Sequence, residues 1–180
     1  MTNIIEHKET PTVAAQRGVT RLNLGSGPDY RKDYINADII GGDVKCDLSK
    51  FPWPWPDESA DEILMMHVLE HLPDTYGTMA EIRRILKPGG KFWGQVPYAF
   101  SYSAFSHPQH YRFFTDQSFG ILAEQTGFTL VNAKLISFPT NIKSKVRNWI
   151  PYRVRYILQG LVLNMFDAVD FELKKPLNSK

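Results

Sequence analysis

A chain of 180 residues, of which 43% are hydrophobic, is long enough to bury one compact core. Its formal net charge of +2 is too small to indicate nucleic-acid binding by bulk electrostatics. The one cysteine, Cys46, excludes an internal disulfide and is typical of a reducing compartment. No run approaches the ~18 apolar residues of a membrane-spanning helix, and residues 1–18 lack the apolar core of a signal peptide. We therefore expect a soluble, cytoplasmic protein.

From Thr20 onwards, segments with strand-like and helix-like patterns alternate, after a polar tail expected over residues 1–19. Strands are predicted within 20–25, 34–39, 43–48, 61–69, 91–98 and 128–138. Helices are predicted from Thr75 to a stop at Pro88-Gly89-Gly90, and from an N-cap at Thr115 to Gly127. Such alternation predicts a parallel sheet flanked by helices.

The last forty residues have a different character. Residues 141–155 are basic, and a helical apolar stripe follows, made of Val154, Ile157, Leu158, Leu161, Val162 and Met165. We expect this stripe to pack on the sheet or on a second copy, with the cations solvated, rather than to lie on a membrane surface. Residues 168–174 alternate strictly between apolar and charged side chains, which favours an added antiparallel strand.

The predicted fold is therefore a single-domain, doubly wound, Rossmann-like α/β protein with a mostly parallel sheet. Residues 20–140 would form the core, and residues 141–180 would add a basic helix and the final antiparallel strand that completes the sheet.

A glycine-rich turn follows the first predicted strand. Gly25 and Gly27 would let a ligand approach the backbone closely, and Asp38 ends the second strand, where a carboxylate can bind ribose hydroxyls. The same residues would also suit a plain tight turn. A nicotinamide dinucleotide is disfavoured, because Tyr30 stands where the fingerprint needs its third glycine. Asp38 also follows Gly25 by thirteen residues, against about twenty in the fingerprint.

Five segments occur in an order that resembles the class I S-adenosylmethionine-dependent methyltransferases, and more narrowly a short bacterial and archaeal group with a compressed first helix. They are "LNLGSGP", "INADI", "CDLSKFPWPWPDESADEILMMHVLEHL", "EIRRILKPGG" and "KFWGQVPY". The resemblance covers residues 20 to 138 and implies that S-adenosyl-L-methionine is the cofactor. It implies a binding site made of Asn23, Gly25, Ser26, Gly27, Asp38, Asp47, Leu48 and His67.

Within that site, the resemblance assigns the turn and His67 to the methionine end, Asp38 to the ribose, and Asp47 with Leu48 to the adenine. The chain departs from the family at two positions. Asn23 replaces the acid common in the first strand, and Asp29 stands where many members carry glycine.

The stretch "HVLEH", His67 to His71, matches the H-x-x-E-H zinc-protease pattern. The pattern needs a helix that places both histidines on one face. Here His67 directly follows a strand-like run and Pro73 comes two residues after His71, so we predict no metal site.

The loop after the fifth core strand carries candidates for the acceptor side. We expect His110 to act as a general base or to orient the acceptor, and Arg112 to anchor a polar or anionic acceptor. The plainer alternative is that both residues only hold the loop in place. His107 is a weaker candidate because Pro108 suggests a turn there. Trp53 and Trp55 would either form a rim over the ligand or be buried against the sheet.

The function that follows is methyl transfer from S-adenosyl-L-methionine to a small-molecule or glycan acceptor (EC 2.1.1), by a monomer or homodimer without a nucleic-acid partner. Two alternatives stay open: a non-catalytic protein that keeps the fold as a binding or scaffold module, and a nicotinamide-dependent oxidoreductase.

Overall fold

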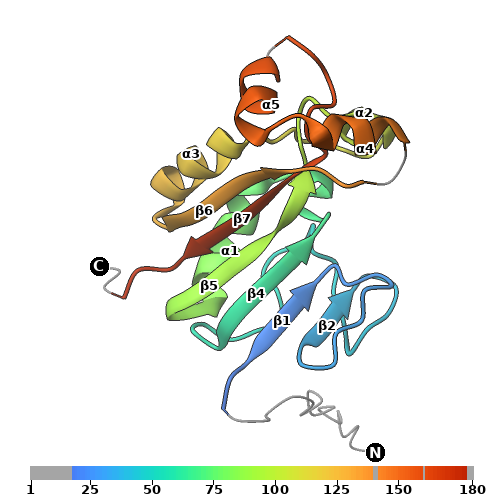
Figure 1. The fold of residues 1–180 in the computed structure, drawn as a ribbon. Coiled ribbons are helices and arrows are strands. Elements are labelled where there is room, and N and C mark those ends of the chain that lie inside the picture. The colour runs from blue at the N-terminus through green and yellow to red at the C-terminus, as the bar shows by residue number, and fades with distance from the viewer. Residues whose placement is uncertain (1–17, 140–141, 160, 178–180) are drawn as a thin grey trace, which may run out of the picture.

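The computed structural model describes residues 18–139, 142–159 and 161–177, which form a seven-stranded sheet with helices packed on it (Figure 1). Most of the tail predicted over residues 1–19 lies outside this part of the chain. The strands are β1 (Arg21–Leu24), β2 (Ile35–Asp38), β3 (Val44–Lys45), β4 (Ala60–Met66), β5 (Leu86–Pro97), β6 (Thr129–Ile136) and β7 (Ala168–Lys174). The helical segments are η1 (Leu69–His71), α1 (Thr75–Ile85), α2 (Tyr102–Ser106), α3 (Asp116–Thr126), α4 (Ile142–Trp149) and α5 (Tyr152–Leu158).

The strand order is β3-β2-β1-β4-β5-β7-β6, with β1 to β5 parallel and β7 antiparallel to both of its neighbours. The predicted α/β fold with an antiparallel C-terminal strand is therefore confirmed. β7 does not lie at the edge of the sheet but between β5 and β6. Its apolar residues Val169, Phe171 and Leu173 are all buried in the core.

The helix α1 ends earlier than predicted. Its N-cap is Asp74, whose carboxylate accepts a hydrogen bond from the Gly77 amide at 2.8 Å. The helix stops at Ile85, and Leu86 already pairs with Ala60 of β4. Pro88 accounts for the early stop, because proline disfavours helical backbone at the residue before it and removes a helical donor.

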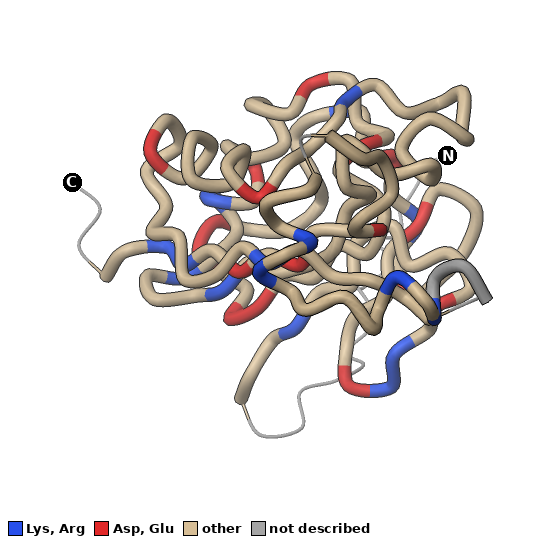
Figure 2. Tube along the Cα trace, turned by 45° about the horizontal axis from the view of Figure 1, so that its top comes forward, with Lys and Arg blue, Asp and Glu red and all other residues tan. Residues whose placement is uncertain are grey.

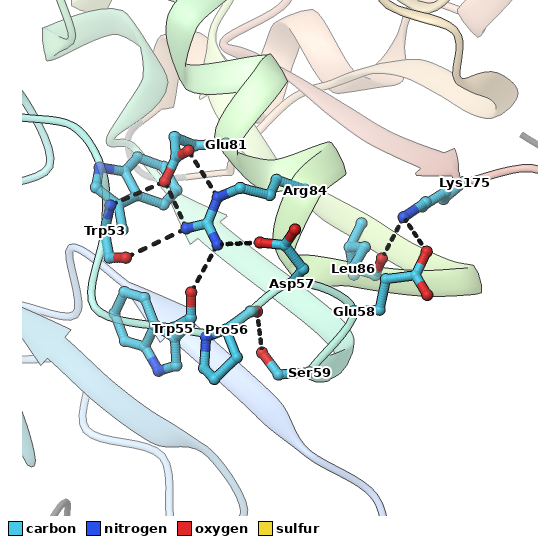
Figure 3. Close-up of polar contacts among 10 residues, drawn as sticks. All are labelled: Trp53, Trp55, Pro56, Asp57, Glu58, Ser59, Glu81, Arg84, Leu86 and Lys175. Carbon is cyan, nitrogen blue, oxygen red and sulfur yellow. Dashed lines mark hydrogen bonds and ion pairs between the residues drawn. The ribbon is translucent and has the colours of Figure 1, made fainter. Parts of the chain in front are cut away.

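The two tryptophans of the proline-rich loop are buried, with exposed fractions of 2% for Trp53 and 8% for Trp55. The Arg84 guanidinium reaches from α1 to the carbonyls of both tryptophans, at 3.2 and 2.8 Å, and forms ion pairs with Glu81 and Asp57 (Figure 3). Of the two sequence-based alternatives for these tryptophans, the structure therefore shows burial.

The apolar stripe near the C-terminus packs on the rest of the fold only in part: Met165 lies against the core, whereas four of the six residues are exposed. Packing on a second copy stays a prediction. The helix α5 ends at Leu158, and the Ile157 side chain on it is 75% exposed. Leu161, beyond the helix, is 85% exposed. Two of the cations make the contacts instead, so they are not simply solvated. Arg147 forms an ion pair with Asp167, and Arg155 donates to Ser137 Oγ at 2.7 Å and lies over the Phe166 ring.

The charge distribution along the described trace is mixed. Figure 2 shows Lys and Arg positions interspersed with Asp and Glu positions. None of the helices in the described ranges is long and apolar enough to cross a bilayer.

Candidate functional site

A cavity of about 810 Å³ opens where β1, β2 and β4 end. This is the edge at which doubly wound sheets bind their ligands, and the volume lies in the usual range for small-molecule sites. Six of the eight predicted cofactor residues line it, namely Gly25, Gly27, Asp38, Asp47, Leu48 and His67. The described lining also includes Ile39, Ile40, Cys46, Ser49, Val68, His71, Leu72, His107, Gln109 and Tyr111.

The two glycines of the turn after β1 have left-handed backbone but different surroundings. Gly25 has a φ of +69°, and a Cβ built on it would lie 2.5 Å from Val68 Cγ2. Gly27 has a φ of +46°, but a Cβ there would have no atom within 4 Å. Gly25 thus permits close packing on the segment after β4, whereas Gly27 leaves space on the cavity side.

Asp38 is held at the end of β2 by two backbone donors. Its Oδ2 accepts a hydrogen bond from the Gly27 amide and its Oδ1 accepts one from the Ile40 amide, both at 3.0 Å. A carboxylate has about four acceptor sites. The side chain therefore keeps acceptor capacity toward the cavity while its orientation is restricted.

Asp47 lies in the loop after β3. The hydroxyl and amide of Ser49 and the Lys50 ammonium lower its pKa to about 2, with the Ser49 hydroxyl the largest cause. The adjacent Leu48 is buried, and its carbonyl accepts a hydrogen bond from Trp53 Nε1 at 3.3 Å. An ionised acceptor and an apolar side chain consequently lie together on this side of the cavity.

His67 directly follows β4, with a φ of +55° that turns the chain out of the sheet. Its ring Nε2 lies 2.8 Å from Gln95 Oε1, and Gln95 donates to Asp170 at 2.7 Å. On the other side, Nδ1 lies 3.5 Å from the carboxylate of Glu70. Glu70 raises the pKa of His67, and this effect outweighs the opposing effect of burial.

Two of the predicted cofactor residues lie behind the turn rather than on the cavity wall. The Asn23 amide donates to the Asp29 carbonyl at 2.7 Å and to Asn36 Oδ1 at 3.0 Å, so it braces the loop from inside. Ser26 is 4% exposed, and its hydroxyl has no hydrogen-bond partner among the described residues.

The loop from His107 to Phe114 closes one side of the cavity. The Tyr111 amide donates to the Glu70 carbonyl at 2.9 Å, which docks the loop on η1. The Arg112 guanidinium donates to the carbonyls of Pro73 and Tyr111, at 2.9 and 3.1 Å. Neither Arg112 nor His110 is among the described lining residues; His107, Gln109 and Tyr111 are.

The sequence did not predict the side-chain cluster of His71, His107 and His110. One ring nitrogen from each lies within 4.8 Å of the others. The H-x-x-E-H pattern includes His71 but predicts His67 as its partner. In the structure His67 forms a hydrogen bond with Gln95 instead. Only the folding of the distant loop onto η1 brings the three imidazoles together.

Comparisons with known proteins agree with this geometry. Residues 25–94 match the family described as "Methyltransferase domain". Over 77 residues the chain is 35% identical to cycloartenol-C-24-methyltransferase of Arabidopsis thaliana. This alignment covers 41% of the chain but spans only about a quarter (23%) of the plant enzyme.

Two solved structures extend the likeness to nearly the whole chain. A SAM-dependent methyltransferase from Archaeoglobus fulgidus has a TM-score of 0.63 at 16% identity, covering 88% of this chain and 87% of its own. The phosphoethanolamine N-methyltransferase 2 of Haemonchus contortus, solved with S-adenosyl-L-methionine, has a TM-score of 0.55 at 16% identity, covering 92% and 50%. At these identities the likeness shows the fold alone.

The sheet order, with a cavity at its carboxyl edge, defines a Rossmann-like fold of the kind seen in solved methyltransferases. Over residues 25–94 the chain is similar to the methyltransferase-domain family, and its fold is similar to that of solved S-adenosylmethionine-dependent methyltransferases. The narrower assignment to a short bacterial and archaeal group stays a prediction.

Proposed function

We propose that the cavity binds S-adenosyl-L-methionine and that the chain catalyses methyl transfer to a small-molecule or glycan acceptor. The observation that carries this proposal is the Asp38 carboxylate, held by the Gly27 and Ile40 amides at the edge where the strands end. When bound, the cofactor supplies a methyl group on a positively charged sulfur, so the protein's task is mainly binding and alignment.

The residues of the cavity fit such a ligand. Gly27 leaves open space beside the turn, and the neighbouring Ser26 hydroxyl is buried with no hydrogen-bond partner in the described part of the chain. In our proposal Asp38 binds the ribose hydroxyls and Asp47 with Leu48 binds the adenine. His67 would lie at the methionine end, and Asn23 and Ser26 would shape the turn from behind.

On the acceptor side, the hydrogen bonds of His110 and Arg112 to backbone carbonyls favour a role in positioning the loop for both residues. The guanidinium of Arg112 is engaged with backbone carbonyls, and His110 Nδ1 donates to the Ala104 carbonyl at 2.8 Å. The lone pair on His110 Nε2 is the group left for a proton or a metal ion. His107 and Tyr111, which line the cavity, are closer to an incoming acceptor.

Calorimetric titration with S-adenosylmethionine and S-adenosylhomocysteine tests the cofactor. We expect micromolar binding that Asp38→Ala weakens at least tenfold, about 1.4 kcal/mol. Asp33→Ala is the matched control, because Asp33 is an exposed acid outside the cavity lining. Failure of folded wild-type protein to bind either ligand would overturn the proposal.

A non-catalytic binding protein with the same fold is the second candidate. The contacts of Asn23, which commit its amide to the loop rather than to the cavity, favour it. Formation of S-adenosylhomocysteine in the presence of small-molecule or glycan acceptors distinguishes the two, since a binding module would bind the cofactor without converting it.

A further inference from the structure

Three of the five histidines in the chain meet at one side of the cavity. His71 ends η1, His107 caps the C-terminus of α2, and His110 lies in the loop that follows. The ring centroid of His71 lies 5.0 Å from the ring centroid of His107 and 4.7 Å from that of His110. The sequence brings only His107 and His110 near each other, so the cluster is a product of the fold.

Backbone carbonyls orient two of the three rings. Nδ1 of His71 lies 3.2 Å from the Gln109 carbonyl oxygen, and Nδ1 of His110 lies 2.8 Å from the Ala104 carbonyl oxygen. A carbonyl can only accept, so each Nδ1 carries the proton and each Nε2 carries a lone pair. This is the arrangement of metal-binding histidines, in which a hydrogen bond at one nitrogen sets the tautomer and directs the other toward the metal.

His107 is the adjustable member of the cluster. It is exposed, and its Nδ1 accepts only a long hydrogen bond of 3.3 Å from the Gln109 amide. Ligand nitrogens around a tetrahedral zinc ion lie about 3.3 Å apart, as follows from Zn–N bonds of about 2.0 Å. Separations near the upper bound of 4.8 Å must therefore contract when a metal binds, and the exposed His107 is the side chain with the most room to move.

We propose that His71, His107 and His110 bind one divalent transition-metal ion, such as zinc, at the edge of the cavity. Imidazole nitrogen suits zinc, copper, nickel and iron, whereas magnesium and calcium prefer oxygen. Three protein ligands leave the fourth tetrahedral position open, as in zinc sites that act on substrates.

The open coordination position of the proposed metal ion would be accessible to a ligand in the cavity. His71 and His107 line the same cavity as Asp38 and His67. A hydroxyl or anionic oxygen of a molecule there could enter the fourth position. The metal site itself does not depend on the proposed function, because it is built from residues outside the predicted cofactor set.

Metal titration of untagged protein tests the site. All variants carry His7→Ala, which removes the fifth histidine, and metal is first stripped with a chelator. We expect one zinc ion per chain with a micromolar or lower Kd. Cobalt should give the visible absorption of a tetrahedral site with nitrogen ligands. His71→Ala, His107→Ala and His110→Ala should each weaken zinc binding at least tenfold.

His67→Ala is the matched control, since it removes the other histidine of the H-x-x-E-H stretch. It should leave the zinc Kd within about twofold. Absence of stoichiometric binding would overturn the proposal. So would binding that is lost in His67→Ala and His71→Ala but kept in His107→Ala, because that result would assign the metal to the H-x-x-E-H pair. Circular dichroism of each variant establishes that it is folded, and the exposed His107 is the substitution least able to disturb the fold.

This titration is done without S-adenosylmethionine, and the cofactor titration above is done without metal. Failure of one proposal is therefore distinguishable from failure of the other.

Discussion

The Nε2 atom of His67 lies 2.8 Å from the amide oxygen of Gln95. Gln95 belongs to β5 and donates onward to Asp170 of β7. This relay joins the end of β4, at the cavity, to the antiparallel strand inserted from the C-terminal part of the chain. The His67 side chain is thus oriented from one side by Gln95 and faces the buried Glu70 on the other.

The first prediction concerns the titration of His67. Because Glu70 raises its pKa, the pKa measured by NMR should lie above the ordinary value of about 6.5, and Glu70→Gln should lower it. Because the pKa is higher in the folded state, protonated His67 stabilises the fold. This contribution is complete at a pH below the unfolded-state pKa, and it is lost as the pH rises through the folded-state pKa. Glu124→Gln, on the exposed side of α3, is the control and should leave the His67 pKa unchanged. If the His67 pKa in Glu70→Gln equals that in the wild-type protein, Glu70 is not the cause of the raised pKa.

The second prediction concerns Gly25. Gly25→Ala combines left-handed backbone with a Cβ only 2.5 Å from Val68 Cγ2. We expect it to lower the free energy of unfolding by about 1–3 kcal/mol. Adding Val68→Ala should relieve the steric part but not the backbone part. Gly41→Ala is the control, since its φ is ordinary and its Cβ would meet nothing within 4 Å. Urea denaturation measures all four proteins; equal stabilities of Gly25→Ala and Gly41→Ala would refute the assignment.

The third prediction concerns Gly27, which we expect to affect ligand binding rather than stability. Asparagine tolerates left-handed backbone better than most residues, so Gly27→Asn should fold while its side chain projects into the open space of the cavity. We expect the Kd for S-adenosylmethionine to rise at least tenfold. Gly18→Asn has a similar positive φ and open surroundings outside the cavity lining, and should bind as wild type. Unchanged affinity in Gly27→Asn would show that the ligand does not lie beside this turn.

The fourth prediction concerns Arg84, whose guanidinium joins α1 to the tryptophan loop (Figure 3). Arg84→Ala leaves the Trp53 and Trp55 carbonyls without this donor, and it removes the cation beside Glu81, which keeps the hydrogen bond from the Trp53 amide. We expect a loss of about 2–3 kcal/mol in the free energy of unfolding. Arg83→Ala on the same helix removes only one long hydrogen bond, of 3.4 Å to Gly127, and should cost much less. Chemical denaturation followed by tryptophan fluorescence suits the measurement, and a similar loss in both variants would argue against the network.

Much of the fold could be predicted because local signals are strong where strands end. The apolar runs before Gly25 and Asp38, and the alternation over residues 168–174, specify strands from their neighbours alone. The cap at Thr115 and the left-handed Gly127 likewise delimit α3 as predicted. The glycine turn and Asp38 were found in the sequence for the same reason, since both occupy the ends of strands that a parallel sheet aligns.

The sequence by itself determined the strand–helix alternation, the antiparallel character of the last strand and the glycine turn and Asp38 at the ends of the first two strands. Only the tertiary structure decided that β7 lies between β5 and β6, that Trp53 is buried, and that His71 meets His107 and His110. The physical reason is the range of the interactions. Periodicity and turn chemistry act between near neighbours, whereas the side chains that share a site are brought together by loop docking and strand pairing across many tens of residues, for which the local sequence carries no signal.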